Sequence, residues 1–419
     1  MYRLFFILFG YTFVFHWYPY FFPWLSPDQP SAPLLIIISR DLLFILVLAV
    51  FFYRLTATGF RLKNLNYRPV SAVFLFYFFF FIVLLFGTLH TNLAEFMQHN
   101  VRNMMMYLLI IPVFFYVADS YDRAVTIKIS KIFLVMGTLL SLFGIGTLLF
   151  FDRELLWSGI RIYSLMGNPN TFGLFLIIPG LIATALIIQD VPTRLKIIMS
   201  LVIVLNSIAL ILTISFQSVI SYIIALCLLV FLFKGRKIFV PLTVIFLFLA
   251  ALFYFIYEYY YTFIDFIFFK LEDPTSTSIT GRIEQLHYVI DRLKEIRNWP
   301  FGVFSLKEYM LFDSQYYNII INNGLMALFL YLAPPFLVIL LGLKYKKTVI
   351  DKEDPWLVSI YMSSIVFLIV TLMITANLTA FMQRYPINLY YFLFLAIILH
   401  SVCRKQKIVK KGKVLSNKV

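Results

Sequence analysis

Blocks of apolar residues separated by short polar breaks run along almost the whole chain. Three of them, at residues 70–87, 132–151 and 238–256, approach the roughly 20 residues with which an α-helix crosses the hydrocarbon of a bilayer. The pattern predicts an all-α polytopic membrane protein with about twelve transmembrane helices. The expected spans are 4–22, 34–52, 70–88, 103–118, 130–150, 171–188, 196–214, 218–233, 239–257, 318–343, 356–374 and 387–402.

The break between the seventh and eighth expected spans is unusually short. It consists only of Ser215, Phe216 and Gln217. Three residues can close a tight hairpin, or they can interrupt one broken helix. The sequence leaves both alternatives open.

The composition agrees with the pattern. Hydrophobic residues make up 62% of the chain and charged residues only 13%, against about 25% charged in an ordinary soluble domain. The first apolar block begins at Leu4 without a small-residue cleavage site before the next block, so we expect a retained helix. Cys227 and Cys403 lie in or beside apolar blocks, and we expect neither a disulfide framework nor a thiolate metal site.

The net charge of +15 indicates how the chain is oriented in the membrane. Most of the 35 Lys and Arg residues lie in alternate short loops and in the tail, which predicts cytoplasmic amino and carboxyl termini. The basic tail, 404–419, is expected at the anionic cytoplasmic leaflet. Nucleic-acid binding is excluded because no soluble basic fold is present to carry it.

The expected organisation is one membrane domain interrupted by a single large loop. Residues 1–257 hold the first nine spans, and residues 318–403 hold the last three. The loop between them, 258–317, is placed outside the membrane. We expect functional residues on this outer side, because Lys and Arg usually concentrate in the cytoplasmic loops and positive charge retained outside goes against that bias.

Two outer positions carry conspicuous arginines. Arg40 stands beside Asp41 inside the second expected span, as either a structural ion pair or a cavity wall that attracts an anion. Arg161 opens the segment 161–170, in which Gly167 and Pro169 indicate a turn, and Asn170 or Thr171 is expected to cap the helix that follows. Arg161 itself is either a ligand-binding residue or a solvated loop residue.

The large loop contains a second set of candidates. The apolar spacing within 281–297 predicts an amphipathic helix on the membrane surface or on the helical bundle. Arg282 in its first turn either binds phosphate or lies in solvent. Asp313 is either a general base for a hydroxyl nucleophile or a helix cap. His90, His99 and His287 lack a metal-ligand spacing, and no metal is expected.

Taken in order, these motifs resemble the O-antigen ligase and polysaccharide polymerase superfamily. The resemblance covers about residues 155–330 and rests on Arg161 with Gly-Asn-Pro-Asn before a span, Gly281-Arg282, Pro300-Phe301-Gly302, and Asp313 with Tyr316 before Gly324-Leu325. It implies a GT-C-like fold and a metal-independent glycosyltransferase that needs no cofactor. The implied donor and acceptor are polyprenyl-diphosphate-linked oligosaccharides, as with undecaprenyl diphosphate, with a flippase and a chain-length regulator as candidate partners.

The resemblance also assigns roles to residues. Arg161 and Arg282 would converge on the diphosphate beside Asn168 and Asn170. Asp313 would be the catalytic base, with Tyr316 and Tyr317 as positioning groups. Ligases of the superfamily commonly have His-Asn in place of Asp313-Ser314, so the resemblance is closer to the polymerases that make O-antigen, capsule or exopolysaccharide.

A second departure leaves one diphosphate contact unassigned. Ser215-Phe216-Gln217 lacks the arginine that the superfamily shows beside the serine, and three arginines are candidate substitutes: Arg40, Arg102 and Arg384. The alternatives to a polymerase are a ligase that transfers the glycan to another acceptor and a transporter that moves the lipid-linked unit without chemistry.

Overall fold

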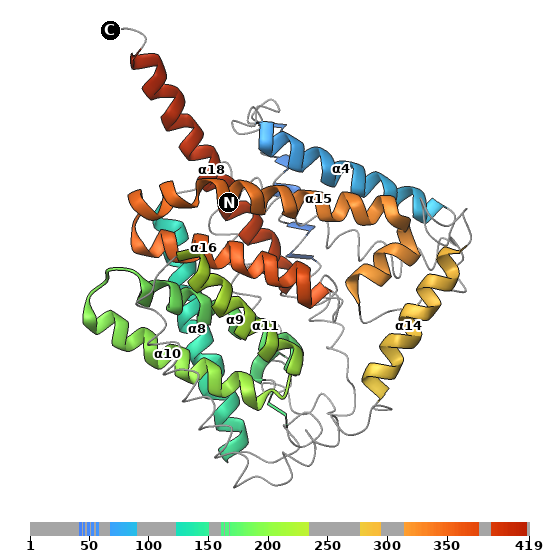
Figure 1. The fold of residues 1–419 in the computed structure, drawn as a ribbon, viewed down its shortest axis with the longest axis horizontal. Helices are drawn as coiled ribbons and strands as arrows, with labels where there is room; N and C mark the ends of the chain where they lie inside the picture. The colour runs from blue at the N-terminus through green and yellow to red at the C-terminus, as the bar shows by residue number, and fades with distance from the viewer. Residues whose placement is uncertain are drawn as a thin grey trace. The chain divides into compact units, whose positions relative to one another are not determined.

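The computed structural model describes residues 68–89, 123–150, 161–162, 164–166, 168–233, 277–294, 314–376 and 387–416, with scattered positions between 42 and 57. Every regular element within these residues is helical (Figure 1). In chain order they are α4 (Arg68–Leu89), α8 (Arg123–Phe150), the 3₁₀-helix η3 (Ser164–Met166), α9 (Pro169–Ile188), α10 (Thr193–Leu212), α11 (Phe216–Phe233), α14 (Thr277–Leu293), α15 (Gln315–Lys352), α16 (Pro355–Val370), the π-helix η7 (Thr371–Thr375) and α18 (Ile387–Ser416).

Within the described residues, these helices agree with the prediction of an all-α membrane protein, and the count of about twelve spans stays a prediction. Five are long and apolar enough to cross a membrane: Ala124–Leu148, Pro169–Ile188, Thr193–Leu212, Asn323–Asp351 and Pro355–Thr375. Shorter apolar helices occupy Arg68–Val83, Gln217–Phe233 and Ile387–Cys403. All coincide with expected spans. The expected spans at 4–22, 103–118 and 239–257 lie outside the described residues, as does most of 34–52.

Several helices extend beyond the apolar blocks that predicted them. α8 begins at Arg123, α15 runs from Gln315 to Lys352, and α18 continues through the basic segment to Ser416. Helical hydrogen bonding does not stop where the hydrocarbon ends, so polar flanks prolong these helices. α15 is interrupted at Gly324, whose φ of 81° and ψ of 177° are open to glycine because it has no Cβ.

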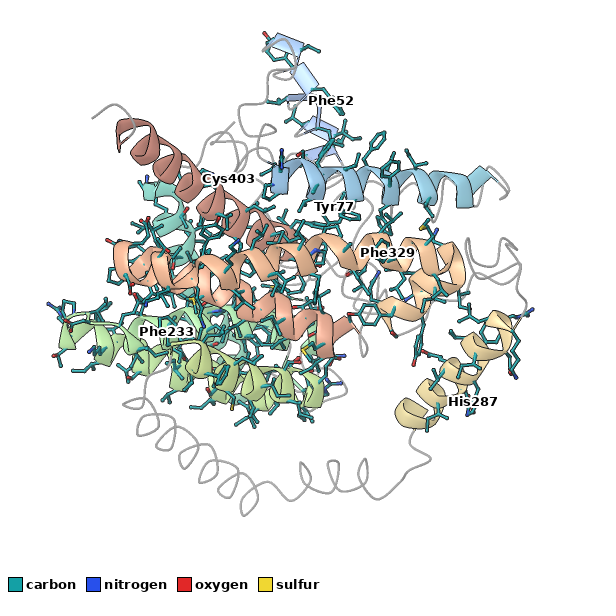
Figure 2. The ribbon with its side chains drawn as sticks, turned by 45° about the horizontal axis from the view of Figure 1, so that its top comes forward. Phe52, Tyr77, Phe233, His287, Phe329 and Cys403 are labelled. Carbon is teal, nitrogen blue, oxygen red and sulfur yellow. The ribbon has the colours of Figure 1, made fainter. Side chains whose placement is uncertain are left out.

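The chain forms two compact units. One comprises Met1–Ile132, Ala327–Ile369 and Phe381–Val419. Within it, aromatic rings pack across helices: Phe80 of α4 lies 5.9 Å from Tyr331 of α15 between ring centroids, and Tyr77 lies 6.3 Å from Phe392 of α18. Figure 2 labels Tyr77 on α4. Lys131 of α8 lies 5.2 Å from the centroid of the Trp356 ring of α16, a cation–π contact.

The second unit comprises Phe133–Met326 and Val370–Ala380. α9 is its central helix, which is buried along most of its length and packs against both α10 and α11. Small residues allow this close approach. A Cβ added at Gly173 would lie 2.6 Å from the Ser218 hydroxyl of α11, and one at Gly180 would lie 2.6 Å from the Tyr222 hydroxyl. The outward side of α10 carries apolar side chains, among them Leu201 at 64% exposure.

Contacts to α9 decide between the hairpin and the broken helix. α11 runs parallel to α9, because Ser218 meets Gly173 and Tyr222 meets Gly180. α10 runs antiparallel, because a four-residue turn joins its start to the end of α9 and its last turn lies by the start of α9, where Leu210 approaches Gly173. The chain therefore reverses as a tight hairpin at Thr213–Ser215. Ile214 at its tip has a φ of 48°, a strain of order 1 kcal/mol.

Two glycines of α8 test how α8 packs against α9. A Cβ at Gly137 would lie 2.6 Å from the rigid ring of Pro179 in α9, whereas a Cβ at Gly146 would have no atom within 4 Å. We expect Gly137→Ala to destabilise the protein by about 1–3 kcal/mol through overpacking. The matched Gly146→Ala should be neutral or stabilising, because alanine favours the helix. Thermal unfolding in detergent measures both, and equal melting temperatures would contradict the packing of α8 on α9.

Candidate functional site

Arg161 is held at the point where α9 begins and the α10–α11 hairpin turns. Its Nε donates to the carbonyl oxygen of Thr213 at 2.9 Å, and its Nη2 donates to Oδ1 of Asn170 at 3.1 Å. The backbone N–H of Ile162 donates to the carbonyl of Leu212 at 3.2 Å. The segment before α9 is thus fastened to the end of α10 by both backbone and side chain.

The charge of Arg161 has no carboxylate partner in the described part of the chain. Its side chain is half-buried, and both of its acceptors are neutral. Burial lowers the pKa of Arg161 from its ordinary value, but a guanidinium stays protonated in proteins. A guanidinium has five N–H groups, and the two bonds to Thr213 and Asn170 use two of them. The result is a desolvated positive charge with donors left over, a suitable arrangement for an anion.

The two asparagines of this segment support the structure around Arg161. Asn168 is the N-cap of α9: its Oδ1 accepts from the backbone N–H groups of Asn170 at 2.8 Å and Thr171 at 3.4 Å. The expectation that Asn170 or Thr171 is the cap was wrong, because Pro169 takes the first helical position, where it needs no N–H, and the capping residue precedes it. Asn170 instead orients Arg161. The predicted contacts of both asparagines with a substrate stay predictions.

Ser164 and the hairpin hydroxyls complete the surroundings of Arg161. Ser164, with a φ of 49°, donates its hydroxyl to the carbonyl of Leu140 in α8 at 2.7 Å. Thr213 donates its hydroxyl to the Leu210 carbonyl at 2.7 Å and accepts from the Ser215 N–H at 3.2 Å. The hydroxyls of Ser215 and Ser218 lie 2.8 Å apart. These buried bonds fix the backbone that presents the Thr213 carbonyl to Arg161.

A second group of polar side chains meets η7. The Tyr316 hydroxyl donates to the Leu372 carbonyl, and the Ser314 hydroxyl donates to the Ala376 carbonyl at 3.2 Å. Gln217 of α11 donates its Nε2 to the Thr375 carbonyl at 3.5 Å. Burial raises the pKa of the Tyr316 phenol. Tyr316 is therefore a neutral hydrogen-bond donor to the backbone.

Tyr317 joins the large loop to α15. Its ring packs in an apolar cluster with Val289 and Leu293 of α14 and Ile321 of α15. α14 thus packs against the first turns of α15, and the alternatives of the membrane surface and the bundle stay predictions. A second stripe of the same helix stays exposed: Ile283, Leu286 and Ile290. The polar side of α14 carries Asp291 and His287. The hydrogen bond from Lys294, at 2.6 Å, lowers the pKa of Asp291. His287 is exposed and points away from α15 (Figure 2).

The other sequence-predicted site residues are not placed. Arg40, Arg102, Asp313 and Arg384 lie outside the described residues. Arg282 belongs to α14, but its side chain is also outside them, so its convergence with Arg161 stays a prediction. Where the structure describes the chain, it groups no three His, Cys, Asp or Glu side chains around one point.

Sequence reasoning missed the polar partners of Arg161 and Tyr316. The sequence places Ser215 and Gln217 in a break between two spans, where the arginine of the superfamily is missing, and it places Thr213 within an apolar span. Three hydroxyl residues within Thr213–Ser218 were an available signal. The π-turn of η7 had no such signal, because its Thr371-Leu-Met-Ile-Thr375 sequence also suits an ordinary α-helix.

Comparison with known proteins adds no relative: no protein-family model matches this chain, and no curated protein matches it.

Substitution of Asn168 tests whether it is a cap or a ligand. Asn168→Ala should lower the free energy of unfolding by about 1 kcal/mol through loss of the cap. Asn168→Ser retains an oxygen acceptor, so it should restore thermal stability and leave pyrophosphate affinity at the wild-type value. A serine variant that melts normally but binds pyrophosphate several times more weakly would identify the Asn168 amide as a ligand.

Proposed function

We propose that this protein is a membrane glycosyltransferase of the polysaccharide polymerase type. It extends polyprenyl-diphosphate-linked oligosaccharide repeat units into a surface polysaccharide on the outer face of the bacterial cytoplasmic membrane. In this proposal the fold is GT-C-like with about twelve spans. The large loop faces outward, and both termini are cytoplasmic.

One observation carries the proposal: the half-buried guanidinium of Arg161 is fixed by neutral acceptors and has no carboxylate partner in the described residues. A charge taken out of water at such a place is costly unless a counter-charge compensates it. A lipid diphosphate supplies that counter-charge, and its oxygens fit the planar donors of a guanidinium. The donor can reach the site from the membrane while its lipid tail stays in hydrocarbon.

The chemistry follows from the leaving group. The hydroxyl of an acceptor glycan attacks the anomeric carbon of the donor sugar and forms the new glycosidic bond, while the bond from that carbon to the diphosphate oxygen breaks. The electron pair leaves with the diphosphate, whose growing charge Arg161 and Arg282 stabilise. The hydroxyl proton passes to Asp313. Neither a nucleotide nor a metal ion is required for this balance.

Two alternatives differ in what they do with the same anion site. A ligase would transfer the glycan to a different lipid or wall polymer, and Asp313-Ser314 in place of the His-Asn of ligases argues against it. A transporter would bind the diphosphate without breaking the glycosidic bond. Incubation of the purified protein with a lipid-diphosphate oligosaccharide in detergent distinguishes the three candidates. Of these, only a polymerase lengthens the oligosaccharide and releases free lipid diphosphate.

Replacement of Arg161 tests the anion site. Arg161→Lys keeps the charge and loses the planar fork, so donor affinity should fall about tenfold, as for one lost charge-assisted hydrogen bond. Arg161→Gln should lose more. The matched control is Arg194→Lys, an exposed arginine in the first turn of α10, which should bind the donor normally. Wild-type affinity in Arg161→Gln would remove Arg161 from the site.

Replacement of Asp313 tests the proposed base. Asp313→Asn should slow elongation by about a hundredfold or more, the usual contribution of a general base, while donor affinity persists. Asp291→Asn is the control, because Asp291 is exposed and bonded to Lys294. It should leave the rate unchanged. An Asp313→Asn protein that elongates at the wild-type rate would show that Asp313 is not the base and would leave the helix-cap alternative.

A further inference from the structure

The carbonyl end of η7 is where the first turns of two other helices are fastened. A π-turn departs from the regular hydrogen-bond pairing of an α-helix. Here the carbonyls of Leu372, Thr375 and Ala376 accept from side chains of other elements. π-turns of this kind occur often at functional sites.

Two of the three donors belong to the start of α15. Ser314 precedes α15 and donates to Ala376, and Tyr316 in its first turn donates to Leu372. The Ser314 backbone carbonyl also accepts from Nδ2 of Asn318 at 2.9 Å, which ties the same turn to itself. The Gln217 contact is long at 3.5 Å and contributes little. It shows, however, that the first turn of α11 lies against the same carbonyl end.

These contacts relate the two halves of the proposed site. α11 begins directly after the hairpin whose Thr213 carbonyl holds Arg161. α15 begins two residues after Asp313 in the sequence. η7 is thus a common support for the segment behind the arginine and the segment that follows the proposed base.

We infer that Ser314 and Tyr316 are positioning residues, which hold the first turn of α15 on the carbonyl end of η7 and so fix its place relative to the Arg161 hairpin. The inference rests on the proposed function. Neither hydroxyl touches the substrate in this arrangement, and both act through the backbone that they anchor. Their loss misplaces the acceptor side of the site and leaves the donor-binding arginine in place.

Tyr361 provides a matched control for a merely structural hydroxyl. Its phenol donates to the Gly342 carbonyl at 2.8 Å, a bond of the same kind between α16 and α15 in the other unit. Tyr316→Phe and Tyr361→Phe each remove one phenol–carbonyl hydrogen bond and keep the ring. A general loss of stability would affect both variants alike, whereas misplacement of the site would affect only the first.

Two readouts on the full-length protein in detergent test the inference. Hydrogen–deuterium exchange should be about tenfold faster at residues 314–323 in Tyr316→Phe, as expected for one lost hydrogen bond, and unchanged there in Tyr361→Phe. Elongation of the lipid-diphosphate oligosaccharide should show a kcat lower by about tenfold to a hundredfold in Tyr316→Phe. The KM for donor and the pyrophosphate affinity should stay within about twofold of wild type.

The outcomes separate this inference from the function on which it rests. A wild-type protein that does not elongate the oligosaccharide overturns the proposed function. If the wild type is active, unchanged exchange or unchanged kcat in Tyr316→Phe overturns the positioning role. An equal fall of kcat in Tyr361→Phe overturns it as well, because a remote hydroxyl would then matter as much. Slower turnover confined to Tyr316→Phe, with normal pyrophosphate affinity, supports it.

Discussion

The hydrogen bond from Arg161 to the Thr213 carbonyl is the interaction on which the second unit depends. Where a helix ends inside a bundle, its last carbonyls need donors, because no bulk water reaches them. At the end of α10 the donor is a guanidinium, which adds a full positive charge to the hydrogen bond. A neutral donor would have satisfied the carbonyl equally well. The use of an arginine therefore leaves a half-buried charge that the described residues do not neutralise, and this is the physical basis of the proposed diphosphate site.

The same requirement is met differently at η7. There the carbonyls accept from uncharged donors, the hydroxyls of Ser314 and Tyr316 and the amide of Gln217. These bonds assemble structure without creating charge. The contrast separates a charged part, around α9 and the α10–α11 hairpin, from a neutral part at the start of α15, where side chains bond to backbone carbonyls.

Close packing around α9 makes the hairpin possible. Gly173 and Gly180 let α11 approach so near that a methyl group would collide with Ser218 or Tyr222. α9 is consequently buried along most of its length, and its first turn, with the Asn168 cap, cannot shift independently. Rigid support of this kind matters for a bidentate contact, since a guanidinium holds a diphosphate well only when its plane is oriented beforehand.

The sequence by itself determined the class of protein and the places where helices run. Apolar blocks located the apolar helices of the described residues, although α15 and α18 continue well past the apolar blocks that predicted them. Sequence also singled out Arg161, because a positive charge in a loop predicted to lie on the outer side goes against the positive-inside bias. It could not decide that the chain reverses at Ser215, that Asn168 caps α9, or that Tyr316 points to a backbone carbonyl. Those features depend on which helix lies beside which, and residues such as Thr213 and Asn170 acquire their roles only when distant segments meet. The local pattern of apolar and polar residues predicts the environment of each residue, whereas the tertiary fold determines which group a buried polar side chain contacts.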